Sequence, residues 1–259
     1  MKGVLTLFLR AIGIGRAPTT RAGVLYVWSE RVVLVALLGM MSLQAFPQLL
    51  FPHSISYQDV TMYSPSQLPS ESVDVLRKAT DLVHASELAV PGRRERVFVS
   101  SERWRAWLFK PFSGAFGFSI SLTDNVFVTE GDIRLNMSRS SEVDIAPRSL
   151  SSVIAHEITH GLIRNRIGIV GAGRLPAWVN EGYCDYVSRE SSFSIDEGRR
   201  LLISGQRDPS RSFQYFVYRE MVRHLIEERG LRFEQVIALA DQYESVKAET
   251  IAALKAHVQ

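Results

Sequence analysis

The 259-residue chain is 46% hydrophobic and 22% charged, which suits a globular domain with an additional apolar segment. It contains one cysteine, Cys184, so an intrachain disulfide is excluded. Five of the 30 basic residues and one of the 27 acidic residues precede position 32, which leaves 25 basic and 26 acidic residues after it. The folded part is therefore nearly neutral, and nucleic acid is not expected as a partner.

The first clear element is the uncharged run VVLVALLGMMSLQAFPQLLF at 32–51. Twenty helical residues span about 30 Å, the thickness of a bilayer core. Because Lys and Arg precede this run and none follows until Arg77, the positive-inside rule predicts a cytoplasmic basic tail at 1–31 and a single-pass anchor at 32–51. The remainder would be extracytoplasmic, and periplasmic in a bacterium. A cleaved signal is one alternative; a buried soluble helix containing Pro47 is another.

The remaining sequence predicts an α+β fold, with a small mixed sheet before a helical half. Residues 52–72 are rich in Pro and Ser and read as a linker with a short strand, so the predicted domain covers 73–259. Periodicity predicts a helix at 73–89, strands at 96–101, 124–130 and 132–137, a loop or strand at 112–121, and helices at 148–166, 175–189, 211–230, 232–241 and 246–257.

The strongest chemical signal is HEITH at 156–160. Residues four apart project from the same face of a helix, so His156 and His160 could hold one metal ion. Glu157 lies about 100° further round, where it can reach a metal-bound water without being a ligand. Zinc lowers the pKa of such a water to about 7, and a nearby carboxylate can take its proton. A chance match in an ordinary helix is the competing interpretation.

A catalytic zinc also needs a third protein ligand and an open position. Glu181 lies on the next predicted helix, where an antiparallel arrangement could bring it to the metal. Asp185 follows one turn later and could accept a hydrogen bond from the far nitrogen of a zinc-bound histidine. Cys184 lies between them but points elsewhere on a helix, so we expect a small buried residue and not a ligand.

The arrangement of AHEITHGLI followed by LPAWVNEGYCDYV resembles the gluzincin metallopeptidases, the thermolysin-like class, and more narrowly the small peptidase-MA-like proteins. The stretch NEGYCD at 180–185 matches the NExxxD pattern of that class. The resemblance implies one zinc per chain, with His156, His160 and Glu181 as ligands. It further implies Glu157 as general base and Asp185 as the carboxylate behind a ligand.

The same resemblance extends weakly to QYFVYREMVRHLIEERG, where Tyr215 aligns with an oxyanion-stabilising tyrosine and Arg219 is a weaker candidate. An aromatic stripe such as the one at 213–218 is more often part of core packing. By analogy with the class, 132–137 would be an edge strand that binds an extended peptide, with Asn136 as a substrate contact.

These residues predict a membrane-anchored zinc peptidase that hydrolyses a peptide or protein substrate. The alternative is a binding or assembly module at the membrane that retains the metallopeptidase fold without turnover. The sequence leaves the cleavage specificity and the oligomeric state open.

Overall fold

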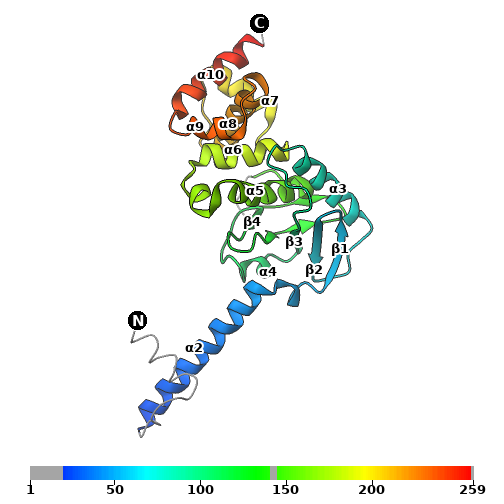
Figure 1. Ribbon diagram of the computed structural model, residues 1–259, viewed down its shortest axis with the longest axis vertical. Helices are drawn as coiled ribbons and strands as arrows, with labels where there is room; N and C mark the ends of the chain where they lie inside the picture. Colours follow the sequence, from blue (N-terminus) through cyan, green and yellow to red (C-terminus); the bar gives the residue numbers. More distant parts are fainter. Residues whose placement is uncertain (1–19, 141–144, 258–259) are drawn as a thin grey trace. The chain divides into compact units, whose positions relative to one another are not determined.

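The computed structural model describes residues 20–140 and 145–257, and the chain divides into two compact units, Met1–Leu49 and Leu50–Gln259. The chain is mixed α/β, with strands between residues 53 and 149 and mainly helices after them (Figure 1).

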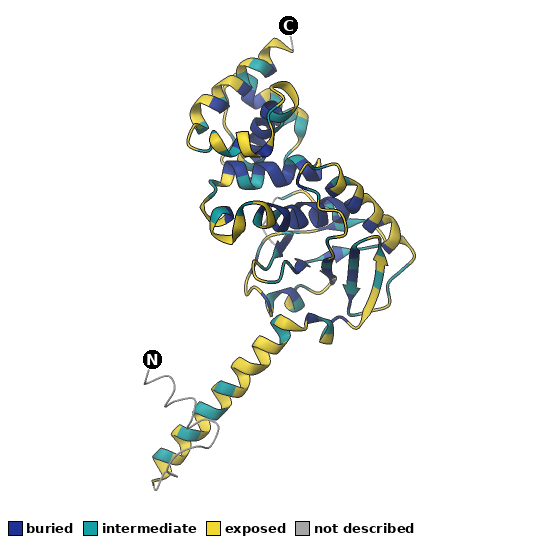
Figure 2. Cartoon of the chain, viewed as in Figure 1, coloured by how far each residue is buried: buried dark blue, intermediate teal, exposed yellow. Residues whose placement is uncertain are grey.

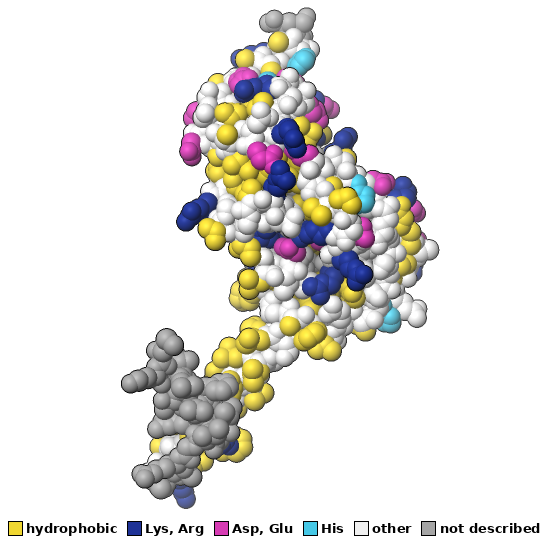
Figure 3. All heavy atoms as spheres, viewed as in Figure 1, with side chains coloured by type: hydrophobic (Ala, Val, Ile, Leu, Met, Phe, Trp, Pro, Cys, Tyr) yellow, Lys and Arg dark blue, Asp and Glu magenta, His cyan; other side chains and the backbone are white. Residues whose placement is uncertain are grey.

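In the first unit, helix α2 (Arg21–Ala45) is followed by the short 3-10 turn η1 (Pro47–Leu49). Thr20 caps α2 by accepting a hydrogen bond from the Gly23 amide at 3.1 Å. None of its residues is buried, and apolar side chains are exposed along it (Figures 2 and 3). Within residues 20–140 and 145–257 it is the one helix long and apolar enough to cross a membrane, criteria that an N-terminal signal sequence also meets.

Helix α2 does not have the predicted bounds of 32–51. It begins at Arg21 and ends at Ala45, so the last six residues of the apolar run lie outside it. Pro47 accounts for the end, because proline disfavours helical geometry at the residue before it and has no N–H to donate.

The second unit is built on a five-stranded mixed sheet with the order β1-β2-β3-β5-β4. The β1–β2 and β5–β4 pairs are antiparallel, and β3 runs parallel to both β2 and β5. The strands are β1 (His53–Tyr57), β2 (Val60–Ser64), β3 (Glu95–Val99), β4 (Gly117–Ser119) and β5 (Val126–Val128). Strand β4 is therefore an edge of this sheet.

The range 52–72 is not a linker. It contains the hairpin β1–β2, which pairs directly with β3 and supplies two of the five strands. Phe51 is also buried in this unit, with its ring 5.3 Å from that of Phe98 and 6.3 Å from that of Phe127. The Pro and Ser residues of this range lie mostly at its ends, and the alternation in VTMYS is a strand signal that the local composition obscured.

The two faces of the sheet bury different side chains because successive strand residues point to opposite sides. One face carries the aromatic residues Phe98 and Phe127, whose rings stack at 4.9 Å. The other face carries valines, including Val97 and Val126, which join the core formed with α3 (Glu71–His84) and α5 (Leu150–Arg174). Helix α5 is thereby held against the sheet (Figure 2).

A second sheet of three short strands replaces the edge strand predicted at 132–137. Strands β6 (Gly131–Asp132), β7 (Met137–Ser138) and β8 (Arg148–Ser149) pair antiparallel, and the residues between β6 and β7 form a turn. Asn136 ends this turn with φ 46°, a left-handed conformation that asparagine tolerates.

The helical half follows the predicted order. After α5 come α6 (Ala177–Ser188), α7 (Ile195–Ser204), α8 (Arg211–Arg223), the π-helical turn η2 (His224–Glu228), α9 (Phe233–Ala238) and α10 (Tyr243–Ala256). Helix α7 and the short α4 (Arg103–Trp107) were not predicted. Helical geometry in α5 breaks at Gly168 (φ 77°), two residues after the predicted end of the helix at Arg166.

Helices α6 and α8 pack closely because Gly182 has no side chain. A Cβ there would lie 2.6 Å from the carbonyl oxygen of Tyr218, which is inside van der Waals contact. This close approach places α8 directly against α6, which in turn packs against α5 (Figure 1).

Candidate metal centre and its cavity

Helix α5 carries His156, Glu157 and His160 on a segment that is almost wholly buried. Only 8% of His156 and 7% of Glu157 are exposed, and both line a cavity together with His160. Buried ionisable side chains are costly unless they are paired or bind an ion. The partners of these three residues therefore decide what the site can do.

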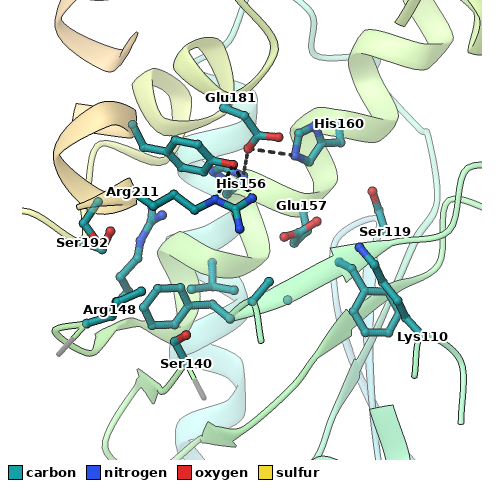
Figure 4. A pocket seen from close by; sticks show the side chains of 18 of the residues that line it. Lys110, Ser119, Ser140, Arg148, His156, Glu157, His160, Glu181, Ser192 and Arg211 are labelled. Carbon is teal, nitrogen blue, oxygen red and sulfur yellow. Dashed lines mark hydrogen bonds and ion pairs between the residues drawn. The ribbon is translucent and has the colours of Figure 1, made fainter. Parts of the chain in front are cut away.

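Glu181 of α6 lies between the two histidines (Figure 4). Its Oε2 atom is 3.3 Å from Nε2 of His156 and 3.7 Å from Nε2 of His160. The two imidazole rings themselves meet edge to face, with centroids 5.0 Å apart. The three side chains that the sequence predicted to act together are thus brought together by α5 and α6.

Asp185, one turn after Glu181, lies behind His156. Its Oδ1 atom is 2.8 Å from Nδ1 of His156 and 2.9 Å from Nη1 of Arg148. Arg148 also donates to the hydroxyls of Ser152 and Ser188 at 3.1 and 3.0 Å. Asp185 is thus held on two sides and directs Nε2 of His156 away from itself, toward Glu181.

The charges at this site are strongly coupled. Burial lowers the pKa of His156, but the charge of Asp185 and the hydrogen bonds that His156 donates to Asp185 and Glu181 outweigh it and raise the pKa to about 10. Burial raises the pKa of Asp185, yet the adjacent Arg148 and His156 bring it below its usual value. Burial likewise opposes ionisation of Glu181, and its contacts with both histidines lower its pKa overall. The carboxylates of Asp185 and Glu181 therefore favour a positive charge at the position between them.

The far nitrogen of His160 faces different partners. Its Nδ1 atom lies 3.2 Å from Oδ1 of Asn180 and 3.3 Å from Sγ of Cys184. The thiol is fully buried, and burial raises its pKa well above the usual value. Cys184 is a small buried residue, as predicted, but its contact with His160 was not foreseen.

His156, His160 and Cys184 form a cluster that could hold a metal ion, because their donor atoms all lie within 4.8 Å of one another. Glu181 offers a further carboxylate oxygen to the same two histidines. Imidazole, thiolate and carboxylate are all ligands that zinc accepts, so the chemistry of the donors fits such an ion.

The cavity in front of the histidines has a volume of about 310 Å³. Strand β4 lies along it and contributes Gly117, Phe118 and Ser119 to its lining. A Cβ at Gly117 would lie 3.1 Å from Cγ of Glu157 and 2.9 Å from the carbonyl oxygen of Phe127. The edge strand therefore passes next to Glu157 because glycine occupies this position.

Tyr215 of α8 lines the cavity, and its hydroxyl accepts a hydrogen bond from Nη2 of Arg211 at 2.8 Å. Burial, followed by the charge of Glu181, raises the pKa of the phenol. Tyr218 is not among the lining residues and accepts a hydrogen bond from Gln214. The aromatic residues at 213–218 therefore have different surroundings, since Tyr215 lines the cavity whereas Phe213 and Phe216 are buried in the core.

Two predicted candidates lie elsewhere. Asn136 is not among the residues that line the cavity, and both ends of its amide are engaged at the start of α5. Its Oδ1 accepts from the Ser151 amide at 2.9 Å and its Nδ2 donates to the Ser151 hydroxyl at 3.2 Å. Arg219 is 9% exposed and pairs with Glu220 at 2.7 Å. Asn136 is therefore a capping residue, and the predicted edge strand at 132–137 is replaced by β4 as the strand beside the cavity.

Sequence reasoning missed several residues of this region. Arg148 belongs to no recognisable sequence motif, and its role depends on a contact with Asp185, which lies 37 positions away in the chain. Gly117 lies in a stretch rich in Gly and Ser, and no local pattern distinguishes it from the neighbouring glycines. His224 belongs to no metal-ligand motif, and it lies 2.8 Å from Glu228 and 3.2 Å from Glu249. The i, i+4 spacing of His224 and Glu228 is the one signal that could have indicated the first of these contacts.

No protein-family model matches this chain, and no curated protein matches its sequence at a significant level.

Proposed function

We propose that the chain is a zinc-dependent peptidase anchored in a membrane by its N-terminal helix. The observation that carries this proposal is the position of Glu181 Oε2, within 3.7 Å of Nε2 of both His156 and His160, beside Glu157 in a cavity. The resemblance of these residues to the gluzincin pattern supports the same assignment.

Glu181 is the better third ligand than Cys184 on geometric grounds. Glu181 lines the cavity and faces Nε2 of both histidines, whereas Cys184 is fully buried and contacts Nδ1 of His160. Nδ1 of His156 is already bonded to Asp185, so His156 offers Nε2 to a metal. A catalytic zinc needs an open position for substrate, and the Nε2 side of the site is the side that opens to the cavity.

A zinc ion held there would polarise the scissile carbonyl and lower the pKa of the attacking water. Glu157 would accept the proton from that water and pass it to the leaving amine, which requires a carboxylate beside the metal and outside its ligand set. Tyr215 would donate a hydrogen bond to the carbonyl oxygen as negative charge develops on it. Asp185 would hold His156 in the required tautomer.

An extended substrate would pair with strand β4. This strand is an edge of the five-stranded sheet, lines the cavity and passes beside Glu157. Edge strands bind extended peptides through unpaired backbone groups. This assignment takes the place of the one based on 132–137.

We also propose a membrane topology, based on the distribution of Lys and Arg around α2. Helix α2 is long and apolar enough to cross a membrane, and Lys and Arg residues precede its apolar part while none follows until Arg77. This asymmetry favours a cytoplasmic N-terminus, with residues 50–259 on the opposite side of the membrane.

The test is hydrolysis of a broad peptide library by the zinc-loaded full-length protein in detergent and by its Glu157→Gln variant. The proposal expects cleavage by the wild type, equal zinc content in both proteins, and a loss of about a thousandfold or more in rate for the variant. Folded, zinc-loaded wild type that cleaves no member of the library would contradict peptidase activity and favour a binding or assembly module. Full activity in Glu157→Gln would contradict the assigned base.

A further inference from the structure

The connection between strands β3 and β4 lies at the end of the sheet where the chain enters the second unit. The start of β1 at His53 pairs with the end of β2 at Ser64. Strand β3 runs parallel to β2, so β3 also ends here, where it pairs with Val128 of β5. Val128 in turn pairs with Gly117, the first residue of β4. Residues 100–116 therefore leave and rejoin the sheet at this entry end.

The entry end is also close to helix α2 along the chain. Helix α2 ends at Ala45, and Phe51, six residues later, is buried against the rings of Phe98 and Phe127. Six extended residues span at most about 22 Å, so Phe51 cannot be further than this from the end of α2. Phe109 of the connection stacks on Phe127 at 4.2 Å. The connection is thus fixed to the same aromatic core as the residue that ends the tether.

Three large apolar side chains of this connection are exposed, those of Trp104, Leu108 and Phe112, which we call the apolar patch. Trp104 and Leu108 are four residues apart on α4 and its C-cap, so they project from one side of this helical turn. Ala106 and Phe109 of the same segment are buried. Single exposed apolar side chains are ordinary on a protein surface, but three within nine residues form a patch that indicates an interaction.

Phe112 is held out of the core by its backbone. Its φ of 57° lies in the left-handed region, which is strained for a bulky side chain. The residue is 86% exposed, and its ring contacts that of Trp107 with centroids 5.9 Å apart. A strained backbone that exposes a large apolar ring is costly in water, which indicates that another apolar medium covers this ring.

We propose that the apolar patch inserts into the surface of the membrane that α2 crosses, at the boundary between lipid headgroups and acyl chains. This inference rests on the part of the proposed function that places α2 across a membrane, and not on peptidase activity. Tryptophan favours this boundary because indole combines an apolar ring with a polar N–H, and Leu and Phe side chains gain from burial there. Ala115 and Phe116 of the same connection line the cavity, so the contact holds that wall of the cavity near the membrane.

The test measures how deeply the patch lies in a bilayer. Full-length Cys184→Ala protein, in which an introduced cysteine is the only one, is labelled at Phe112→Cys with an environment-sensitive fluorophore. It is reconstituted into phosphatidylcholine vesicles that contain nitroxide-labelled lipid. Apolar side chains at a membrane interface lie about 5–10 Å deep, so lipid nitroxides near the headgroups should quench the fluorophore strongly.

The matched control is the same label at Leu122→Cys. Leu122 is 87% exposed and belongs to the same unit, but it lies between β4 and β5, at the opposite end of the sheet from residues 100–116. We expect quenching at position 112 to be at least about threefold stronger than at position 122. This comparison needs no further substitution in the patch.

A second comparison removes the rest of the patch. In the protein labelled at position 112, Trp104→Ser together with Leu108→Ser should lower the quenching by about half or more, because less apolar surface then enters the membrane. Ile169→Ser together with Val170→Ser is the control, since these two apolar side chains are also exposed but lie near the end of α5. It should leave the quenching unchanged.

Equal quenching at positions 112 and 122, quenching at neither, or no effect of the two patch substitutions would overturn the inference. Extraction of the vesicles with alkaline carbonate tests the anchor separately, because a membrane-spanning protein is retained. Release of the protein would contradict the anchor and this contact together, whereas a retained protein with equal quenching contradicts this inference alone. A failure of peptide hydrolysis affects neither measurement.

Discussion

Asp185 holds His156 from behind, with its Oδ1 atom 2.8 Å from Nδ1 of the imidazole, and Arg148 holds Asp185 in turn at 2.9 Å. This buried chain of three residues fixes the direction in which Nε2 of His156 points. In the proposed function, the orientation of this metal ligand therefore depends on two residues that would not contact the metal themselves.

The first prediction concerns this support. Asp185→Asn retains an acceptor for His156 but loses the negative charge, and carboxylates behind metal-bound histidines typically affect metal affinity by about 10- to 100-fold. We expect zinc affinity to weaken by that factor in competition with a chromogenic chelator. Ser188→Ala, which removes a different contact of Arg148, should leave the affinity unchanged. Unchanged affinity in folded Asp185→Asn would show that the contact is not needed to orient His156.

The second prediction concerns the close approach of β4 to Glu157. In Gly117→Ala the new methyl group would lie 2.9 Å from the backbone oxygen of Phe127 and 3.1 Å from Cγ of Glu157, so one of them must shift. We expect kcat to fall by about tenfold or more because a small misplacement of a catalytic group is costly. Zinc content should not change.

The matched control for Gly117→Ala is Gly173→Ala, since a Cβ at Gly173 meets no atom within 4 Å. Equal activity of the two variants would show that β4 can adapt and that its approach to Glu157 does not limit catalysis.

The third prediction follows from Phe51, which is 1% exposed and packs against Phe98 and Phe127. Phe51→Ala should lower the free energy of unfolding of residues 50–259 by about 3–5 kcal/mol, the usual cost of truncating a buried phenylalanine. Urea denaturation measures this. A change below about 1 kcal/mol would mean that Phe51 is not part of the core of residues 50–259, as its place at the end of the predicted anchor implied.

The fourth prediction is a pH dependence of stability. Burial raises the pKa of Glu95 to about 7, against the opposing charge of Arg93. Between the ordinary value of 4.5 and this value, the folded protein keeps a proton that the unfolded chain has released. Stability should therefore fall as pH rises from about 5 to about 7, by up to about 3 kcal/mol from this group.

Glu95→Gln removes the titration, so the variant should match the wild type near pH 5 and exceed it in stability at pH 8. Denaturation of both proteins across this range, at equal zinc content, measures the difference. If the ion pair between Arg93 and Glu95 outweighs burial, Glu95→Gln will instead be less stable by the same amount at every pH.

Local patterns predicted the elements that position the site better than they predicted its surroundings. The i, i+4 spacing of His156 and His160 and the boundary at Pro176 are encoded within single helices, so α5 and α6 could be anticipated. The position of Glu181 relative to both histidines required only that these helices be neighbours.

The rest depended on contacts between distant segments. Strands β1 and β2 are short, and the place of their hairpin in the sheet is decided by the pairing of β2 with β3, which begins 31 residues after β2 ends at Ser64. The choice between β4 and 132–137 as the strand beside the cavity depends on how closely Gly117 can approach α5, which no local pattern reveals.

The most direct test of the central claim is the zinc content of folded residues 50–259, purified without chelators, alongside Glu181→Gln and Cys184→Ala. The account predicts about one zinc per chain in the wild type and in Cys184→Ala, and lost or weakened binding in Glu181→Gln. Absence of zinc from the folded wild type would contradict a metal centre at these histidines. Zinc retained by Glu181→Gln and lost by Cys184→Ala would assign the third ligand to Cys184.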